Sequence, residues 1–474
     1  MPKNKILKNT IYYSVGEIFP RIISFIMLPI YTRYLSPSDY GIIAYTSTIV
    51  SFLYVLGSFS LNSYVLRFYF DYENVSDQKK IIGTAHSFII LLNLLILFLA
   101  FLCMPSLVST FNLQIPWEPF FKMAFITNFL DSISIIPMVV YRVRRDAFKF
   151  MVLGLSKSIV AVVLTVYFVI YCNMGVLGNY WALLYCNLFF SIIYLLVIKQ
   201  HAYYTIKFKF LKEGLKFSAP LLPGAICYML LTISDRIILE RNVCIADLGI
   251  YNVACTMALA LNIVVQSGYK SIEPEVFRRY GSADFYSFTQ RAKNIYFCAI
   301  FVFAMIISLF SQEVFTIMTS EGFHKGYYLV PALIIGGVMT GQNVIYGCVL
   351  QCEKRSKIIG LSTLLGAAIS IITNILLVPV WGVYAAAFAS AISFSAMNAF
   401  LFYSMTFPNK TMKHETIIVL LLLLISYGVF YLCKEVSILL LFFKLLLVGV
   451  FMALVSKMLG VDMKTVTSTI LKRK

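Results

Sequence analysis

The sequence predicts an all-α, polytopic membrane protein with about fourteen transmembrane helices. Of its 474 residues, 60% are hydrophobic and only 13% are charged, whereas soluble domains carry about 25% charged residues. The mean hydropathy is +0.85. Apolar runs of about 20 residues recur along the whole chain, and such a run crosses a bilayer core as a helix but is too long for a barrel strand.

Fourteen apolar runs follow one another along the chain. They cover residues 11–31, 41–61, 81–104, 120–141, 150–171, 176–198, 214–239, 248–269, 292–311, 327–350, 358–379, 382–406, 414–433 and 437–456. Pro379 and Gly382 separate the eleventh run from the twelfth, and Lys434 with Glu435 is the main mark between the last two. Twelve spans is therefore the alternative count.

The distribution of Lys and Arg predicts the orientation. Of the 39 basic residues, 30 fall in the N-terminal and alternate segments and 4 in the remaining loops. Since basic residues concentrate on the cytoplasmic side, both termini are expected in the cytoplasm. The net charge of +18 is then a topology signal, and its spread over eight segments disfavours nucleic-acid binding while favouring contact with anionic lipid headgroups.

The N-terminus, MPKNKILKN, leads into a full-length span without a small-residue cleavage site, so it is expected to be retained. The ten cysteines form no CxxC pair and the four histidines show no metal spacing. No predicted outer loop is longer than about 15 residues, which leaves no room for an extracellular catalytic domain.

An internal repeat divides the chain. LKNTIYYS (7–14) resembles LKEGLKFS (211–218), and PSDYGIIAYTS (37–47) resembles IADLGIYNVAC (245–255). In each copy an Asp-x-Gly-Ile turn opens the next span, where Asp39 and Asp247 are expected to cap the new helix. Both copies run in the same direction, as in transporters built from parallel repeats.

The repeat and the spans predict a domain organisation. The expected parts are an N-terminal six-helix bundle (1–198), a cytoplasmic linker (199–213), a C-terminal six-helix bundle (214–406), two additional transmembrane helices (414–456) and a basic cytoplasmic tail (457–474). Alternation in the linker sequence YTIKFKF predicts an interfacial or short extended piece, with its basic residues facing headgroups.

Charged residues inside the predicted spans are the candidate binding residues. A charge at the bilayer centre costs about 3 kcal/mol or more, so it faces a cavity or a partner. The charged candidates are Arg21, Lys157, Arg236, Glu17, Asp131 and Asp235. Glu17 and Arg21 are four residues apart on one helix face, with Pro20 between them as a kink. Lys122 and Lys444 lie nearer the span ends and are expected to snorkel.

Amide side chains supplement these charges, and Asn262, Gln342 and Asn343 are the amides proposed to contact a ligand. Amides suit sugar hydroxyls, while Arg and Lys suit a diphosphate. The alternatives are intramembrane salt bridges for the charges and interhelical hydrogen bonds for the amides.

Two segments carry a resemblance to a known family. RYLSPSDYGIIAY (33–45) and SDRIILERNVCIADLGIYNVA (234–254) resemble the polysaccharide-biosynthesis branch of the multidrug/oligosaccharidyl-lipid/polysaccharide (MOP) exporter superfamily, which includes Wzx-type flippases. The resemblance implies two six-helix bundles around a central cavity, with two extra C-terminal helices. It implies a location in the bacterial cytoplasmic (inner) membrane and no cofactor, and it leaves coupling to protons or another cation open.

The function that the resemblance implies is a flippase. It would move an undecaprenyl-diphosphate-linked oligosaccharide repeat unit, an O-antigen or capsule or exopolysaccharide precursor, from the cytoplasmic to the outer leaflet by alternating access. Its expected partners are the lipid-linked oligosaccharide, membrane lipids, a polysaccharide polymerase and glycosyltransferases.

Three alternatives stay open. The first is a multidrug or cation antiporter of the same superfamily, although the balance of three acids against three bases among the candidates favours an anionic or zwitterionic ligand. The second is a lipid II flippase. The third is a membrane enzyme, for which Glu321 and His324 in SEGFHKG are the only weak candidates.

Overall fold

The computed structural model describes residues 12–13, 15–16, 19–20, 22–23, 25–406, 412–432 and 438–461, and their regular elements are all helices. The chain forms two compact units, residues 1–249 and 250–474. The predicted domain boundaries place residues 214–249 with the second bundle instead, so those boundaries stay a prediction.

In the first unit the elements run in the following order. They are α2 (Leu28–Tyr34), α3 (Pro37–Ser58), α4 (Leu61–Phe68), η1 (Tyr69–Asp71), α5 (Val75–Thr110), η2 (Trp117–Phe121), α6 (Lys122–Ser132), α7 (Ile135–Val143), α8 (Ala147–Thr165), η3 (Val166–Tyr171), α9 (Gly175–His201), α10 (Phe208–Ser218) and α11 (Leu222–Asn242). The helix α12 (Ile245–Ala258) begins in this unit and ends in the next.

The second unit continues from α12. Its elements are α13 (Leu261–Arg279), α14 (Phe285–Leu309), α15 (Ser311–Met318), η4 (Glu321–Leu329), α16 (Val330–Cys352), α17 (Ser356–Ser404), α18 (Lys413–Leu432) and α19 (Ile438–Met458).

Twelve helical stretches in the described part of the chain are long and apolar enough to cross a membrane. One of them, α17, covers the two predicted spans 358–379 and 382–406. Its backbone turns sharply at Gly382 (φ 55°, ψ −132°), which divides α17 into two helical segments. That φ favours glycine, since it is strained for other residues. Splitting α17 there gives thirteen spans, and parts of the predicted span 11–31 lie outside the described residues. The polytopic, all-α fold class is confirmed.

The first repeat turn is built as a capping box. Ser36 is the N-cap of α3: its hydroxyl accepts from the backbone N–H of Asp39 at 3.2 Å, and the Asp39 carboxylate accepts from the N–H of Ser36 at 2.9 Å. Asp39 therefore takes part in the cap, as predicted, from the third position of the helix, while Ser36 is the N-cap residue. Before α12 the equivalent place is held by Cys244, whose Sγ lies 3.1 Å from Asp247 Oδ2.

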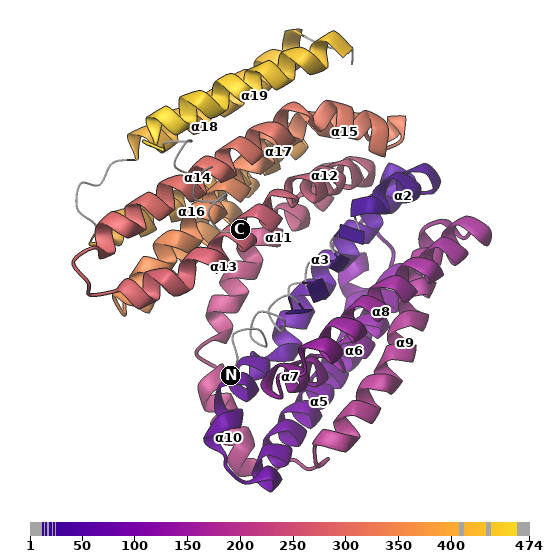
Figure 1. Ribbon diagram of the computed structural model, residues 1–474. Coiled ribbons are helices and arrows are strands. Elements are labelled where there is room, and N and C mark those ends of the chain that lie inside the picture. The colour runs from indigo at the N-terminus through magenta and orange to yellow at the C-terminus, as the bar shows by residue number, and fades with distance from the viewer. Residues whose placement is uncertain are drawn as a thin grey trace. The chain divides into compact units, whose positions relative to one another are not determined.

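The first unit has a core where α4, α5, α7 and α10 meet, with Leu61, Ile81, Ile136 and Phe210 buried in one apolar cluster. Farther along, α6 packs on α9 and α5, and α8 packs on α9 (Figure 1). The helix α11 packs against α3.

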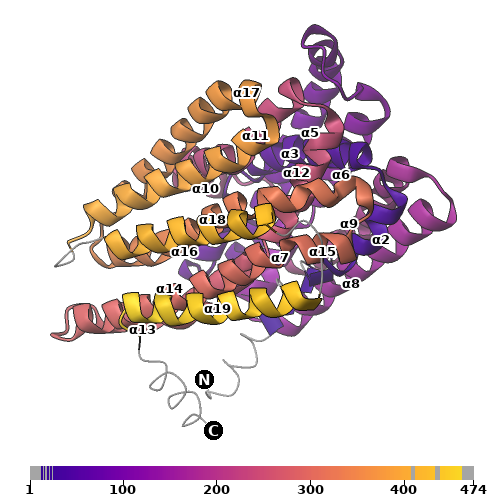
Figure 2. The ribbon, with the colours of Figure 1, turned by 90° about the horizontal axis from the view of Figure 1, so that it is seen from above.

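In the second unit, α14, α16 and α17 form a layer with α13, and the two last helices lie beside it. Figure 2 shows α18 alongside α16 and α19 alongside α14. Two buried ion pairs attach them: Lys293 of α14 with Glu415 of α18 at 3.2 Å, and Glu313 of α15 with Lys444 of α19 at 2.6 Å. The expectation that Lys444 snorkels is wrong, because its side chain is fully buried against Glu313.

Candidate functional site

An ion pair between Asp131 and Lys157 is the centre of the candidate site. Asp131 is near the end of α6 and Lys157 is ten residues into α8, about 15 Å along that helix. The Lys157 ammonium donates to Asp131 Oδ1. That distance along α8 is half of the roughly 30 Å thickness of a bilayer core.

The pair is only partly shielded. The Asp131 side chain keeps 38% of its surface exposed and Lys157 keeps 24%. The Lys157 ammonium also lies 5.9 Å from the centroid of the Tyr194 ring of α9, within reach of a cation–π interaction. The exposed atoms of Asp131 and Lys157 are available to a third polar group. The two ion pairs of the second unit, Lys293–Glu415 and Glu313–Lys444, are buried and leave no such access.

Hydrogen bonds between α6 and α9 hold Asp131 in place. The Ser191 hydroxyl donates to the carbonyl of Leu130 at 2.9 Å, and the Asn187 amide donates to the carbonyl of Thr127 at 3.2 Å. Cys186 lies against the other partner, with its Sγ 3.5 Å from the carbonyl oxygen of Lys157. The pair therefore rests on three helices with fixed mutual positions.

Asp235 and Arg236 lie on a different helix, α11. The Asp235 side chain is buried and accepts from the backbone N–H of Arg236 at 2.7 Å. Arg236 is half-buried and donates to the carbonyl of Thr232 at 3.3 Å, and both residues make further interactions. Their role as ligand contacts stays a prediction.

The end of α11 is tied to the segment before α6. The backbone N–H of Gln114 donates to Glu240 Oε1 at 2.7 Å, and the Gln114 amide donates to the carbonyl of Val243 at 2.9 Å. The sequence did not predict these hydrogen bonds. Gln114 lies in a loop, and Glu240 is followed by Arg241, which is the more obvious partner in the sequence.

The amide candidates belong to the second unit. Asn262 is half-buried in the first turn of α13. Gln342 and Asn343 are buried in α16, and none of their amide nitrogen or oxygen atoms has a hydrogen-bond partner among the described residues. The remaining two candidates, Glu17 and Arg21, lie outside the described residues.

The sequence reasoning missed the two buried ion pairs. Lys293 lies at the start of the predicted span 292–311 and was not among the candidate residues, yet it is buried in α14 beside Glu415. Acidic residues at the ends of apolar runs were the available signal, because Glu313 and Glu415 flank predicted spans. Within the described ranges no cluster of three or more His, Cys, Asp or Glu side chains could hold a metal ion.

Comparison with known proteins decides the family. The sequence profile described as polysaccharide biosynthesis protein matches residues 6–274, more than half of the chain. This chain belongs to the polysaccharide biosynthesis protein family. A protein of the Lsg locus of Haemophilus influenzae is 23% identical over 278 residues. That alignment covers 57% of this chain and 65% of the relative, so the chain spans just under two thirds of that relative's length.

Solved structures share the fold. The lipid II flippase MurJ, in an inward closed conformation, superposes with a TM-score of 0.74 at 14% identity, covering 94% of this chain and 98% of that one. An inward-facing multidrug resistance MATE family transporter of the MOP superfamily gives 0.63 at 12% identity, covering 83% and 93%. This family member is thus a multi-pass membrane protein with the fold of the MOP superfamily.

Proposed function

We propose that this polysaccharide biosynthesis family member is a flippase for an undecaprenyl-diphosphate-linked oligosaccharide. The single observation that carries the proposal is the partly exposed Asp131–Lys157 pair, which lies about half a bilayer thickness along α8. A fixed charge there costs several kcal/mol unless it faces polar groups, and a polar headgroup in transit is such a group. Membership of the polysaccharide biosynthesis protein family supports a cargo that carries sugars.

Lys157 is the proposed contact for the diphosphate or an acidic sugar. Its ammonium presents a compact charge with three donors, which suits phosphate oxygens. Asp131 holds that charge when the headgroup is absent, so an arriving phosphate exchanges one anionic partner for another. The polyprenyl chain remains in lipid while the sugar crosses.

The protein is proposed to lie in the bacterial inner membrane with both termini in the cytoplasm, as its Lys and Arg distribution predicts. Proposed partners in the cell are a polymerase that consumes the exported units and the glycosyltransferases that make them. Transport, rather than catalysis, is the proposed activity.

A lipid II flippase is the second candidate, because the fold of one such protein matches 94% of this chain. The test is complementation in two strains, one lacking a polysaccharide flippase and one depleted of its lipid II flippase. Restored surface polysaccharide without rescue of the second strain supports the proposal. Rescue of the lipid II strain alone contradicts it. Drug susceptibility of an efflux-deficient strain that expresses the protein tests the antiporter alternative. Raised drug resistance would support an antiporter.

A further inference from the structure

The helix α10 has three distinct faces. Phe210, Gly214 and Ser218 form the buried face. Lys209, Lys212 and Lys216, spaced three and four residues apart, form an exposed basic stripe. Between these two faces an apolar edge carries Phe208, of which 76% is exposed, and the half-buried Leu211 and Leu215.

The buried face fixes α10 on the first unit. Glu213 Oε2 accepts hydrogen bonds from Tyr64 at 2.9 Å and Tyr72 at 2.5 Å, and the Ser218 hydroxyl donates to the carbonyl of Ser60 at 3.2 Å. Burial, together with the hydrogen bond to Glu213, raises the pKa of Tyr72 to about 12. The direction of the basic stripe is therefore set by the fold.

The segment before α10 is also fixed. The N–H of Tyr203 donates to the carbonyl of Lys79 at 3.2 Å, and the N–H of Lys207 donates to Thr84 Oγ1 at 3.2 Å. A Cβ on Gly83 would lie 1.8 Å from the Tyr203 carbonyl oxygen, so the segment lies directly on α5. It nevertheless leaves a run of aromatic, aliphatic and basic side chains exposed, namely Tyr203, Tyr204, Ile206, Lys207, Phe208 and Lys209.

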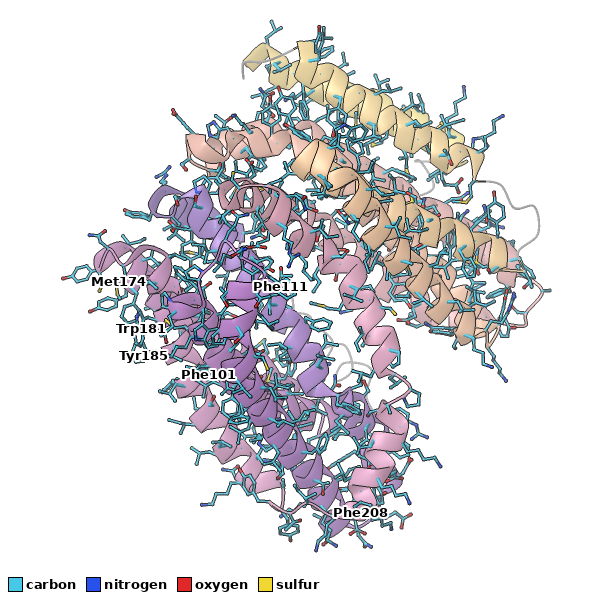
Figure 3. All side chains as sticks on the ribbon, turned by 180° about the vertical axis from the view of Figure 1, so that it is seen from behind. Phe101, Phe111, Met174, Trp181, Tyr185 and Phe208 are labelled. Carbon is cyan, nitrogen blue, oxygen red and sulfur yellow. The ribbon has the colours of Figure 1, made fainter. Side chains whose placement is uncertain are left out.

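The length of α9 places this surface at a membrane boundary. Trp181 and Tyr185 stack near the start of α9 with ring centroids 5.6 Å apart, and Trp and Tyr are enriched at bilayer interfaces. From Trp181 the helix continues for twenty residues to His201, about 30 Å, which is the thickness of the hydrocarbon core. Figure 3 shows Phe208 at the end of the first unit remote from Trp181. The basic stripe thus lies at headgroup level on the opposite side.

We propose that α10 and the segment 203–207 form an interfacial anchor that binds the anionic phospholipid headgroups of one leaflet. Phe208, Leu211 and Leu215 enter the acyl boundary, and Lys209, Lys212 and Lys216 contact lipid phosphates. No acid among the described residues forms an ion pair with these lysines, so their charges are available to the membrane. In the orientation proposed above, that leaflet is the cytoplasmic one.

The test measures lipid preference of the full-length protein in detergent. Fluorescent phosphatidylglycerol and phosphatidylcholine of equal chain length are titrated against the wild type and a variant with Lys209→Gln, Lys212→Gln and Lys216→Gln. The matched control replaces three basic residues of α13, Lys270→Gln, Arg278→Gln and Arg279→Gln, of which the two arginines are already paired with Glu275 and Asp284.

The α10 variant is expected to lose its preference for phosphatidylglycerol by on the order of tenfold or more, and the control by less than about twofold. A third variant with Arg at the same three α10 positions is expected to keep the preference, which separates charge loss from misfolding. Inorganic phosphate is expected to compete no better than chloride at equal ionic strength. Competition by phosphate beyond that level indicates a free-phosphate site and overturns the anchor.

An unchanged preference in the α10 glutamine variant, or an equal loss in the α13 control, also overturns it. If the glutamine variant binds both lipids as the wild type does yet fails to export polysaccharide, the surface serves a protein partner instead.

Discussion

Gly41 of α3 and Gly249 of α12 hold equivalent places in a reciprocal contact. A Cβ on Gly41 would lie 1.9 Å from the carbonyl oxygen of Ile245, and a Cβ on Gly249 would lie 1.9 Å from that of Pro37. Residues 37 and 245 are 208 apart, as are 41 and 249 (245 − 37 = 249 − 41 = 208). The two repeat turns therefore contact each other as the two halves of an isologous interface do.

Replacing Gly41 with Ala is expected to destabilise the protein by about 1–3 kcal/mol, because the methyl group meets backbone that must move. The same change at Gly249 is expected to have a similar effect, since its Cβ would meet the carbonyl oxygen of Pro37 at the same distance. Thermal unfolding in detergent measures both. Gly224→Ala in α11 is the control, because nothing lies within 4 Å of its Cβ position and alanine favours a helix. Equal melting temperatures for Gly41→Ala and Gly224→Ala would show that the contact is not close.

The two capping sites predict opposite effects of single substitutions. Ser36→Ala removes the hydroxyl that accepts from the Asp39 N–H, at an expected cost of about 1 kcal/mol. Cys244→Ser is expected to stabilise α12, because a serine there completes the box that Ser36 and Asp39 form in the first copy. The melting temperature should fall in the first variant and rise in the second. A fall in both would mean that Cys244 is held by contacts which serine lacks.

Removing one partner of the buried Glu313–Lys444 pair is expected to destabilise the protein more than neutralising both partners together. Lys444→Met alone leaves Glu313 buried and uncompensated, at a cost of about 3–5 kcal/mol, whereas the double change Lys444→Met with Glu313→Gln recovers most of that loss. Limited proteolysis before α18 and thermal unfolding report on the attachment of the last helices. If the double variant is no more stable than Lys444→Met, the side chains contribute through packing and not through charge.

The sequence predicted where the spans lie more reliably than which charges meet. Apolar runs fix the helices because hydropathy is a local property, and Gly382 breaks α17 where Pro379 and Gly382 predicted a boundary. Partners distant in sequence are set by packing. Lys293 and Glu415 are 122 residues apart, so no local pattern in the sequence reveals their pairing.

The same reasoning applies to the candidate site. Depth along a span marked Asp131 and Lys157 as interior charges, since each lies well inside an apolar run. Their contact depends on how α6 packs beside α8 and α9, which one sequence does not specify. Glu17 and Arg21 lie outside the described residues, and their role stays a prediction, for which loss of export in Arg21→Ala at normal membrane levels is the expected result.

A charge exchange separates a structural from a functional role of the site pair. Asp131→Lys with Lys157→Asp preserves an ion pair between α6 and α8, so the melting temperature is expected to recover relative to either single variant. Export is expected to stay at least about tenfold below wild type, because the cargo phosphate then meets a carboxylate at position 157. Full recovery of export together with stability would assign the pair to packing alone.

The most direct measurement of the central claim is translocation by the purified protein in proteoliposomes. Undecaprenyl-diphosphate-linked oligosaccharide is placed in both leaflets, and the fraction that becomes accessible to an added sugar-modifying enzyme is followed over time. The account predicts that wild type exposes the inner pool, that Lys157→Gln slows this by about tenfold or more, and that Lys157→Arg retains much of the rate. An inner pool that stays protected with wild-type protein, or an equal rate with Lys157→Gln, would contradict it.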